Sequence, residues 1–180
     1  FEHFQVVQIE GYVNPYKKKK DTEKGYRSLA QYFAQDSKYN VISDSRCEEC
    51  GSRLQSKKSL DKNHLPTYMT FSIFRGTQDN FVETDFDITY VLTFQYGASQ
   101  VKYKFIGVAQ FVSFGHYVAY VCKEPNTVCT RPSASAGNEK WVYYDDRAYK
   151  EGTLNEFFDN RRISHDLRTR CSLLMYKKCT

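Results

Sequence analysis

Residues 104–121 read K-F-I-G-V-A-Q-F-V-S-F-G-H-Y-V-A-Y-V, and residues 140–146 read K-W-V-Y-Y-D-D. The first stretch holds two runs rich in β-branched and aromatic residues, 105–111 and 117–121, a composition typical of half-buried strands. Between them lie Ser113, Phe114 and Gly115, and a glycine there permits the backbone angles of a tight turn. We therefore predict a β-hairpin, followed by a third strand at 141–144.

Three polar side chains lie at the ends of these predicted strands. His116 is the first residue after the turn, and Asp145 and Asp146 end the third strand. If the two strands are antiparallel neighbours, a carboxylate can lie beside the imidazole. A histidine oriented by an aspartate is the base half of a nucleophilic triad. The alternative is that His116 is a polar turn residue and the two aspartates are turn formers.

The catalytic interpretation predicts a definite geometry. One imidazole nitrogen of His116 should lie within about 3.2 Å of an Asp145 oxygen, and the other nitrogen should face a cleft. Asp146 should point to the opposite side of the strand if pairing continues that far, because side chains alternate along a strand. Asp145 is therefore the predicted orienting group, with Asp146 as a supporting group or water anchor.

The sequence G-H-Y-V-A-Y-V followed by W-V-Y-Y-D-D resembles the histidine box of the ubiquitin-specific proteases, papain-like cysteine proteases that remove ubiquitin. Other pieces resemble the same family in the same order, so that the resemblance covers nearly the whole chain. They are S-L at 28–29 with Y-F at 32–33, C-E-E-C at 47–50, L-P at 65–66 with the strand at 68–75, and C-S-L-L-M-Y-K-K at 171–178.

The resemblance implies an α+β fold: an antiparallel palm sheet with one or two packed helices and a finger-like extension. Residues 1–180 would be a single partial domain, finger-like over 1–64 and palm-like over 65–180. The implied function is that of the C-terminal half of a ubiquitin-specific protease catalytic domain, with His116 as general base and Asp145 as its orienting group. The implied partners are ubiquitin or a ubiquitinated protein, and other subunits of a complex.

The family's nucleophilic cysteine lies in a box like N-x-G-N-T-C-Y, far upstream of the histidine box. Here the first cysteine is Cys47, and none of the six cysteines has such a box around it. The chain begins at Phe1, and we interpret it as a piece of a longer protein. The alternative is a degenerate, inactive member that serves as a scaffold or as a ubiquitin-binding module, so whether the chain belongs to an enzyme stays open.

Cys47-Glu-Glu-Cys50 is half of a zinc knuckle. A structural zinc ion takes four ligands, commonly from a second C-x-x-C pair or from histidines. His3 and His64 are possible substitute ligands, but their spacing from Cys47 and Cys50 is unfavourable for a zinc site. We expect no cofactor and no metal, with zinc at Cys47 and Cys50 as the alternative.

The other cysteines, the length of the apolar runs and the net charge indicate where the protein is located and which partners it has. Four further cysteines are interpreted as free thiols of an intracellular protein, cytoplasmic, nuclear or both; they are Cys122, Cys129, Cys171 and Cys179. No apolar run approaches the roughly 20 residues of a membrane helix, so no membrane partner is expected. The net charge is +5, and residues 17–20, K-K-K-K, fit a solvated loop. Nucleic-acid binding is not expected, because no aromatic-basic pattern accompanies that run.

Along the chain we predict a strand at 4–13, a helix at 26–35 and strands at 67–75 and 172–178. Residues 149–163 are predicted as one helix, with Thr153 and Glu156 as a capping box. Phe111 and Phe114 stand where the resembling family has small residues, in a loop that closes over the ubiquitin tail. In that family the ubiquitin tail passes through a narrow channel under this loop. The bulk of the two phenylalanines would narrow the channel, or else the loop is simply shorter and packs differently.

Overall fold

Eight strands form one sheet in the computed structural model, which describes residues 4–10, 27–36, 40–56, 65–75, 81, 83–113, 115–123, 125, 129 and 139–180. The strand order is β1-β4-β10-β6-β7-β8-β9, and β5 pairs with β6 outside that path. The strands are β1 (Phe4–Glu10), β4 (Tyr68–Phe74), β5 (Val91–Tyr96), β6 (Ser99–Ser113), β7 (His116–Cys122), β8 (Lys140–Asp145), β9 (Ala148–Thr153) and β10 (Cys171–Lys178). Together with the helices this is the α+β fold that the sequence predicts.

Most strand pairs are antiparallel, and the exception lies at one edge of the sheet. β1 runs parallel to β4, with Phe4 opposite Tyr68 and Glu10 opposite Phe74. The predicted strand at 4–13 is therefore present over Phe4–Glu10, while residues 11–13 lie outside the described part of the chain. A parallel neighbour requires a long connection between the two strands, and the segment between them includes α1 and the β2–β3 hairpin.

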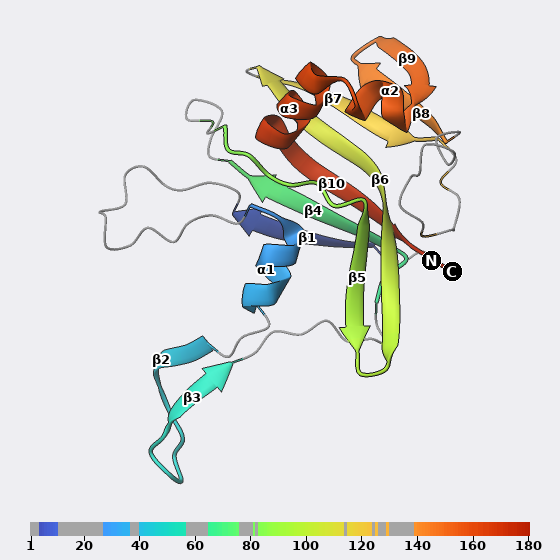
Figure 1. The fold of residues 1–180 in the computed structure, drawn as a ribbon. Helices are drawn as coiled ribbons and strands as arrows, with labels where there is room; N and C mark the ends of the chain where they lie inside the picture. Colours follow the sequence, from blue (N-terminus) through green and yellow to red (C-terminus); the bar gives the residue numbers. More distant parts are fainter. Residues whose placement is uncertain are drawn as a thin grey trace.

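Three helices are described, and they cover different parts of the sheet. α1 (Leu29–Asp36) lies near β1 and β4, whereas α2 (Leu154–Phe158) lies beside β9, and α3 (Arg161–Arg170) packs against β6 and β10 (Figure 1). The Ser28 hydroxyl caps α1 by accepting a hydrogen bond from the Gln31 amide at 3.0 Å. Among the described residues, no helix has the length and apolar character needed to cross a bilayer.

The single helix predicted over 149–163 is wrong. Residues 148–153 form β9 instead, which pairs with β8, and the helical part is divided into α2 and α3. The capping box is present: the Glu156 amide donates to Thr153 Oγ1 at 3.3 Å, and the Thr153 amide donates to Glu156 Oε2 at 2.7 Å. The box marks the start of α2, because its side chains bond to backbone amides that have no partner within the first turn of a helix. The helix therefore begins after Thr153 and not before it.

An aromatic cluster holds α2 against the sheet. Trp141 of β8 stacks on Phe105 of β6 with ring centroids 5.5 Å apart, and Phe158 of α2 meets both rings edge to face. Phe157 meets Tyr120 of β7 in the same way. Such contacts contribute roughly 0.5–1.5 kcal/mol per pair beyond the buried area. The cluster therefore fixes β7 and β8, the two strands whose ends carry His116 and Asp145.

A second, two-stranded sheet lies apart from the main one. β2 (Asn40–Arg46) and β3 (Arg53–Ser56) pair antiparallel, and the hairpin projects away from the body of the molecule (Figure 1). Its tip is the C-x-x-C sequence. The expected division between finger-like and palm-like regions falls at residue 64, which lies in the 57–64 segment outside the described residues.

The expectation of four free thiols outside the C-x-x-C pair is wrong for two of them. Cys129 and Cys179 are joined in a disulfide, with Cα atoms 5.8 Å apart, whereas Cys122 and Cys171 are buried thiols. A separation of 50 residues hides this pairing in the sequence. In the fold, the Cys179 amide bonds to the Lys102 carbonyl of β6 at 2.9 Å, so the end of the chain lies along the sheet where the β7–β8 connection can reach it.

Candidate active site

The turn between β6 and β7 places His116. Gly115 has φ of +71°, a left-handed conformation that favours glycine. The turn closes with Ser113 opposite His116, and the register shifts by one residue between Phe111 and Ser113. His116 is therefore the first residue of a strand in the interior of the sheet, and its position is set by pairing on both sides of β7.

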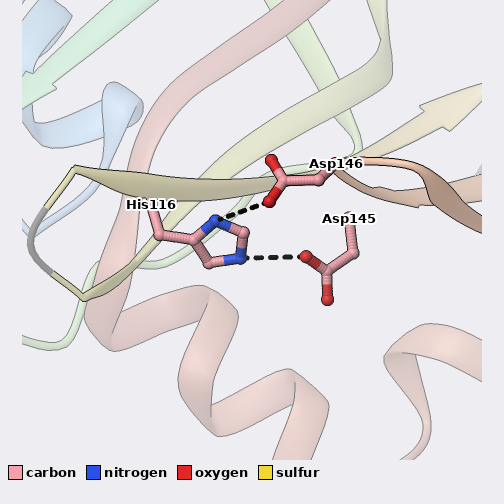
Figure 2. Close-up of side chains that lie close together, drawn as sticks. All are labelled: His116, Asp145 and Asp146. Carbon is pink, nitrogen blue, oxygen red and sulfur yellow. Dashed lines mark ion pairs between the residues drawn. The ribbon is translucent and has the colours of Figure 1, made fainter.

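The pairing of β7 with β8 brings Asp145 beside His116. Ala119 lies opposite Tyr144, so Asp145 is level with Val118, and His116 is its diagonal neighbour two residues nearer the turn. His116 Nε2 lies 2.9 Å from Asp145 Oδ1 (Figure 2). The contact expected between these two residues is thus present. Their side chains are 29% and 39% exposed, so the imidazole is not buried in the core.

Tyr143 holds the far side of the Asp145 carboxylate. Its hydroxyl donates to Asp145 Oδ2 at 3.1 Å, which leaves Oδ1 directed at the imidazole. Burial, together with the hydrogen bond to Asp145, raises the pKa of Tyr143. The sequence prediction missed this residue. The signal was available, because residues two apart on a strand share a face.

Asp146 does not turn away from the imidazole. Pairing of β8 ends at Asp145, and Asp146 begins the turn to β9 with φ of +49°. This conformation carries its carboxylate back to the Nδ1 edge of the ring, where Oδ2 lies 3.6 Å from His116 Nδ1 (Figure 2). The distance is too long for a hydrogen bond. The expected strand alternation fails here because the strand has already ended.

The three side chains also offer a set of metal ligands. His116, Asp145 and Asp146 each offer one ligand atom, and these three atoms lie within 4.8 Å of one another. No other group of three such residues is found in the described part of the chain. Imidazole and carboxylate bind divalent transition metals. A cation bound through Nε2 would have to replace the contact between His116 and Asp145, so metal binding and the histidine–aspartate pair exclude each other at that nitrogen.

The end of β6 before the turn is held by neighbours that the sequence did not indicate. Phe111 is buried and stacks on Phe81, with ring centroids 4.4 Å apart, so its bulk is used in packing. Phe114 lies outside the described residues. Arg170 of α3 donates to the Val112 carbonyl at 3.3 Å and pairs with Glu83 at 2.6 Å. These contacts tie the hairpin that carries His116 to α3.

Cys47 and Cys50 lie in the turn at the tip of the β2–β3 hairpin. The Cys47 amide donates to the Ser52 carbonyl at 2.8 Å, and the Gly51 amide donates to the Cys47 carbonyl at 2.9 Å. Hydrogen bonds from the Ser52 side chain and backbone, and from the Cys47 side chain, lower the pKa of Cys50. No third metal ligand joins this pair within the described part of the chain, while His3 and His64 lie outside it.

None of the six cysteines is placed as a nucleophile for His116. Cys122 is at the other end of β7, about 20 Å away at 3.3 Å per residue. Cys171 is fully buried, and this burial raises its pKa. Cys129 and Cys179 are bonded to each other, and Cys47 and Cys50 lie in the projecting hairpin (Figure 1).

Comparison with known proteins finds solved structures with a similar fold. No protein-family model matches the sequence, and no curated protein matches it. Among solved structures, the chain is similar to one in the SAGA DUB module Ubp8/Sgf11/Sus1/Sgf73 bound to ubiquitin aldehyde (14% identity, TM-score 0.55), and to one in the module bound to monoubiquitin (14%, 0.55). A structure of the yeast SAGA DUB module with an Sgf73 mutant gives 12% identity and a TM-score of 0.57.

The likeness is one of fold. Each match covers 97% of this chain, but the chain spans only 35–36% of the length of the chains it matches. At this identity the matches show the fold alone: the described part of the chain has the architecture of one portion of the matched chains. Two of these structures contain ubiquitin or ubiquitin aldehyde together with several further subunits, and these belong to those assemblies.

Proposed function

We propose that this chain is the C-terminal half of a ubiquitin-specific protease catalytic domain, in which His116 is the general base and Asp145 orients it. The single observation that carries the proposal is the 2.9 Å contact between His116 Nε2 and Asp145 Oδ1 at the ends of two paired strands. The family resemblance of the surrounding sequence and the likeness to the SAGA DUB module support it. The substrate class is then a ubiquitin C-terminal amide.

In this reaction each nitrogen of His116 has a separate role. Nε2–H donates to Asp145, which fixes the tautomer and stabilises the imidazolium when it forms. Nδ1 is then the basic nitrogen: it takes the proton from a cysteine thiol and returns it to the leaving amine. Asp146 lies on the Nδ1 side of the ring, 3.6 Å from that nitrogen, and its side chain is 78% exposed. Tyr143 keeps the Asp145 carboxylate in place.

The thiol in this proposal comes from outside residues 1–180. A second function, that of an inactive scaffold or ubiquitin-binding module, is favoured by one observation: none of the six cysteines of this chain is placed beside His116. Such a module would bind ubiquitin or a ubiquitinated protein within a larger complex and would not cleave it. The histidine–aspartate pair would then contribute only to packing between β7 and β8.

The test uses the longer natural protein that contains residues 1–180. Hydrolysis of a fluorogenic ubiquitin C-terminal amide is measured for the wild type and for His116→Gln, with His165→Gln as the matched control because that side chain is exposed on α3. The proposal predicts that kcat/KM falls by at least about 10²-fold in His116→Gln and is unchanged in the control. Equal activity of the wild type and His116→Gln would reject the catalytic role.

Residues 1–180 alone distinguish the two functions further. We predict that this chain neither hydrolyses the amide nor reacts with a ubiquitin-based thiol probe, because an imidazole without a nucleophile has nothing to acylate. Probe attachment mapped to Cys122 or Cys129 would show that a cysteine of this chain has taken the catalytic role. If the longer protein binds monoubiquitin but shows no turnover and no probe labelling, the scaffold function holds.

A further inference from the structure

The tip of the β2–β3 hairpin holds two thiols in a preformed turn. Two backbone hydrogen bonds close the turn, from Cys47 to Ser52 and from Gly51 to Cys47. Gly51 has φ of +68°, and Arg46 Nη1 donates to its carbonyl at 3.1 Å. The backbone is thus fixed on both sides of the pair, so that the separation of the two cysteines does not depend on a ligand.

The turn places both cysteines at the hairpin tip, and solvent reaches them. The Cys47 amide and carbonyl both take part in the hydrogen bonds that close the turn around Cys50, and Cys50 is exposed while Cys47 is half-buried. The other cysteines differ: Cys122 and Cys171 are buried, and Cys129 and Cys179 are already bonded to each other. Of the six cysteines, this is the one pair of adjacent thiols that a small reagent in solvent can reach.

Two thiols alone are too few for a tetrahedral zinc site, but they are enough for a disulfide. Tetrahedral zinc needs four ligands, and the described residues offer two here. A disulfide needs only the two sulfurs, provided that the backbone lets them meet. The thiolate is the reactive form, and the exposure of Cys50 lets a reagent in solvent reach its sulfur.

We propose that Cys47 and Cys50 form a reversible intramolecular disulfide when the protein meets a peroxide, so that the hairpin tip is an oxidation site. This inference does not depend on the function proposed above. The Cys50 thiolate attacks one peroxide oxygen, the O–O bond breaks and hydroxide leaves, giving a sulfenic acid. The Cys47 thiolate then attacks that sulfur and expels a second hydroxide. Two thiols and one hydrogen peroxide become one disulfide and two waters, and a dithiol reductant reverses the change.

The sequence around the pair gives a direct measurement. Trypsin cleaves after Arg46 and Arg53, so one peptide, residues 47–53, carries both cysteines. The purified protein is reduced, treated with a chelator, exposed to hydrogen peroxide, alkylated and digested without reduction. The expected peptide is lighter than the dithiol by two hydrogen atoms and carries no alkyl group. Treatment with dithiothreitol before alkylation should restore two alkylated cysteines.

Two comparisons make the test specific. In Cys50→Ser the disulfide cannot form, so Cys47 should stay alkylatable. The peptides that contain Cys122 and Cys171 serve as internal controls, since burial should keep both thiols reduced and alkylatable after denaturation. The proposal is overturned if peptide 47–53 keeps two alkylated cysteines after peroxide, or if Cys50 links two chains. It is also overturned if about one zinc per chain resists the chelator and is lost in Cys47→Ser.

Discussion

His116 Nε2 and Asp145 Oδ1 lie 2.9 Å apart across two paired strands, and the second Asp145 oxygen is bound by the Tyr143 hydroxyl at 3.1 Å. Each oxygen of the carboxylate therefore has its own partner, the imidazole on one side and the phenol on the other. Asp146 makes no comparable contact: it is 3.6 Å from Nδ1, and its side chain is 78% exposed. The two adjacent aspartates should consequently contribute to function to different degrees.

Asp145→Asn should impair catalysis far more than Asp146→Asn. An amide at position 145 can present its NH₂ group to the ring and so stabilise the wrong tautomer, whereas at position 146 only a solvent-screened charge is removed. In the longer protein we expect kcat/KM to fall by at least about 10²-fold for Asp145→Asn and by less than about tenfold for Asp146→Asn. Hydrolysis of a ubiquitin C-terminal amide measures both.

Asp159→Asn is the matched control for these variants, because Asp159 is exposed at the end of α2. It should leave kcat/KM unchanged. If Asp146→Asn proved the more damaging substitution, the orienting role would belong to Asp146 and our assignment of the two carboxylates would be reversed.

Arg75 should be critical for stability. It is 2% exposed, and its guanidinium donates to the carbonyls of Cys171 (2.8 Å), Thr84 (2.5 Å) and Arg168 (2.8 Å). Arg75→Met would leave three carbonyls without this donor, at about 1–3 kcal/mol for each one that stays buried. We expect the free energy of unfolding in urea to fall by about 3 kcal/mol or more.

Arg161→Met provides the comparison, since Arg161 is exposed at the start of α3. Its effect should stay within about 0.5 kcal/mol. Comparable losses in the two variants would mean that the carbonyls around Arg75 find other donors or water, and that the guanidinium is not what joins β4 to the end of α3.

The hairpin and the histidine–aspartate contact could be predicted from sequence because both depend on local patterns. Strand composition and a glycine define β6, the turn and β7. Once β7 and β8 pair antiparallel, the start of one must lie near the end of the other, which brings Asp145 to His116. Nothing else in the chain has to be known for that step.

Other features depend on contacts distant in sequence or on the point where a strand ends. Residues 148–153 carry no strong strand pattern and form β9 only because β8 offers an edge to pair with. Asp146 reaches the ring because pairing stops one residue earlier. The partnership of Cys129 with Cys179, and the parallel pairing of β1 with β4, follow from the path of the whole chain and leave no local signal.

Stability should decrease in alkaline solution because of buried tyrosines. Burial raises the pKa of Tyr103 and of Tyr120 from 10.0 to about 12. Below pH 10 both phenols are neutral in the folded and unfolded states, so the stabilisation is fully present there. Between about pH 10 and pH 12 the unfolded chain loses these protons while the folded chain keeps them, so unfolding becomes easier as pH rises. Urea unfolding at increasing pH measures this slope.

Tyr103→Phe and Tyr120→Phe should each reduce the slope, by at most about 1.4 kcal/mol per pH unit. Tyr149→Phe is the matched control and should leave the slope unchanged, because that side chain is 68% exposed. Tyr103→Phe also removes the hydroxyl that donates to the Pro66 carbonyl at 2.6 Å, so stability at neutral pH is compared separately. A slope that both core variants leave intact would contradict the assignment.

The disulfide between Cys129 and Cys179 should make the stability of the protein depend on reductant. It closes a loop over a sequence separation of 50 residues, and cross-linking a loop of that size restricts the unfolded chain by about 4 kcal/mol in the chain-entropy description. We expect dithiothreitol to lower the free energy of unfolding by up to that amount. Cys129→Ser should be destabilised similarly in oxidising buffer and should no longer respond to the reductant.

A wild-type protein whose unfolding is the same with and without dithiothreitol would show that these two cysteines are not bonded in solution. The β7–β8 connection would then be attached to the sheet through the ion pair of Lys104 with Glu139, without a covalent link.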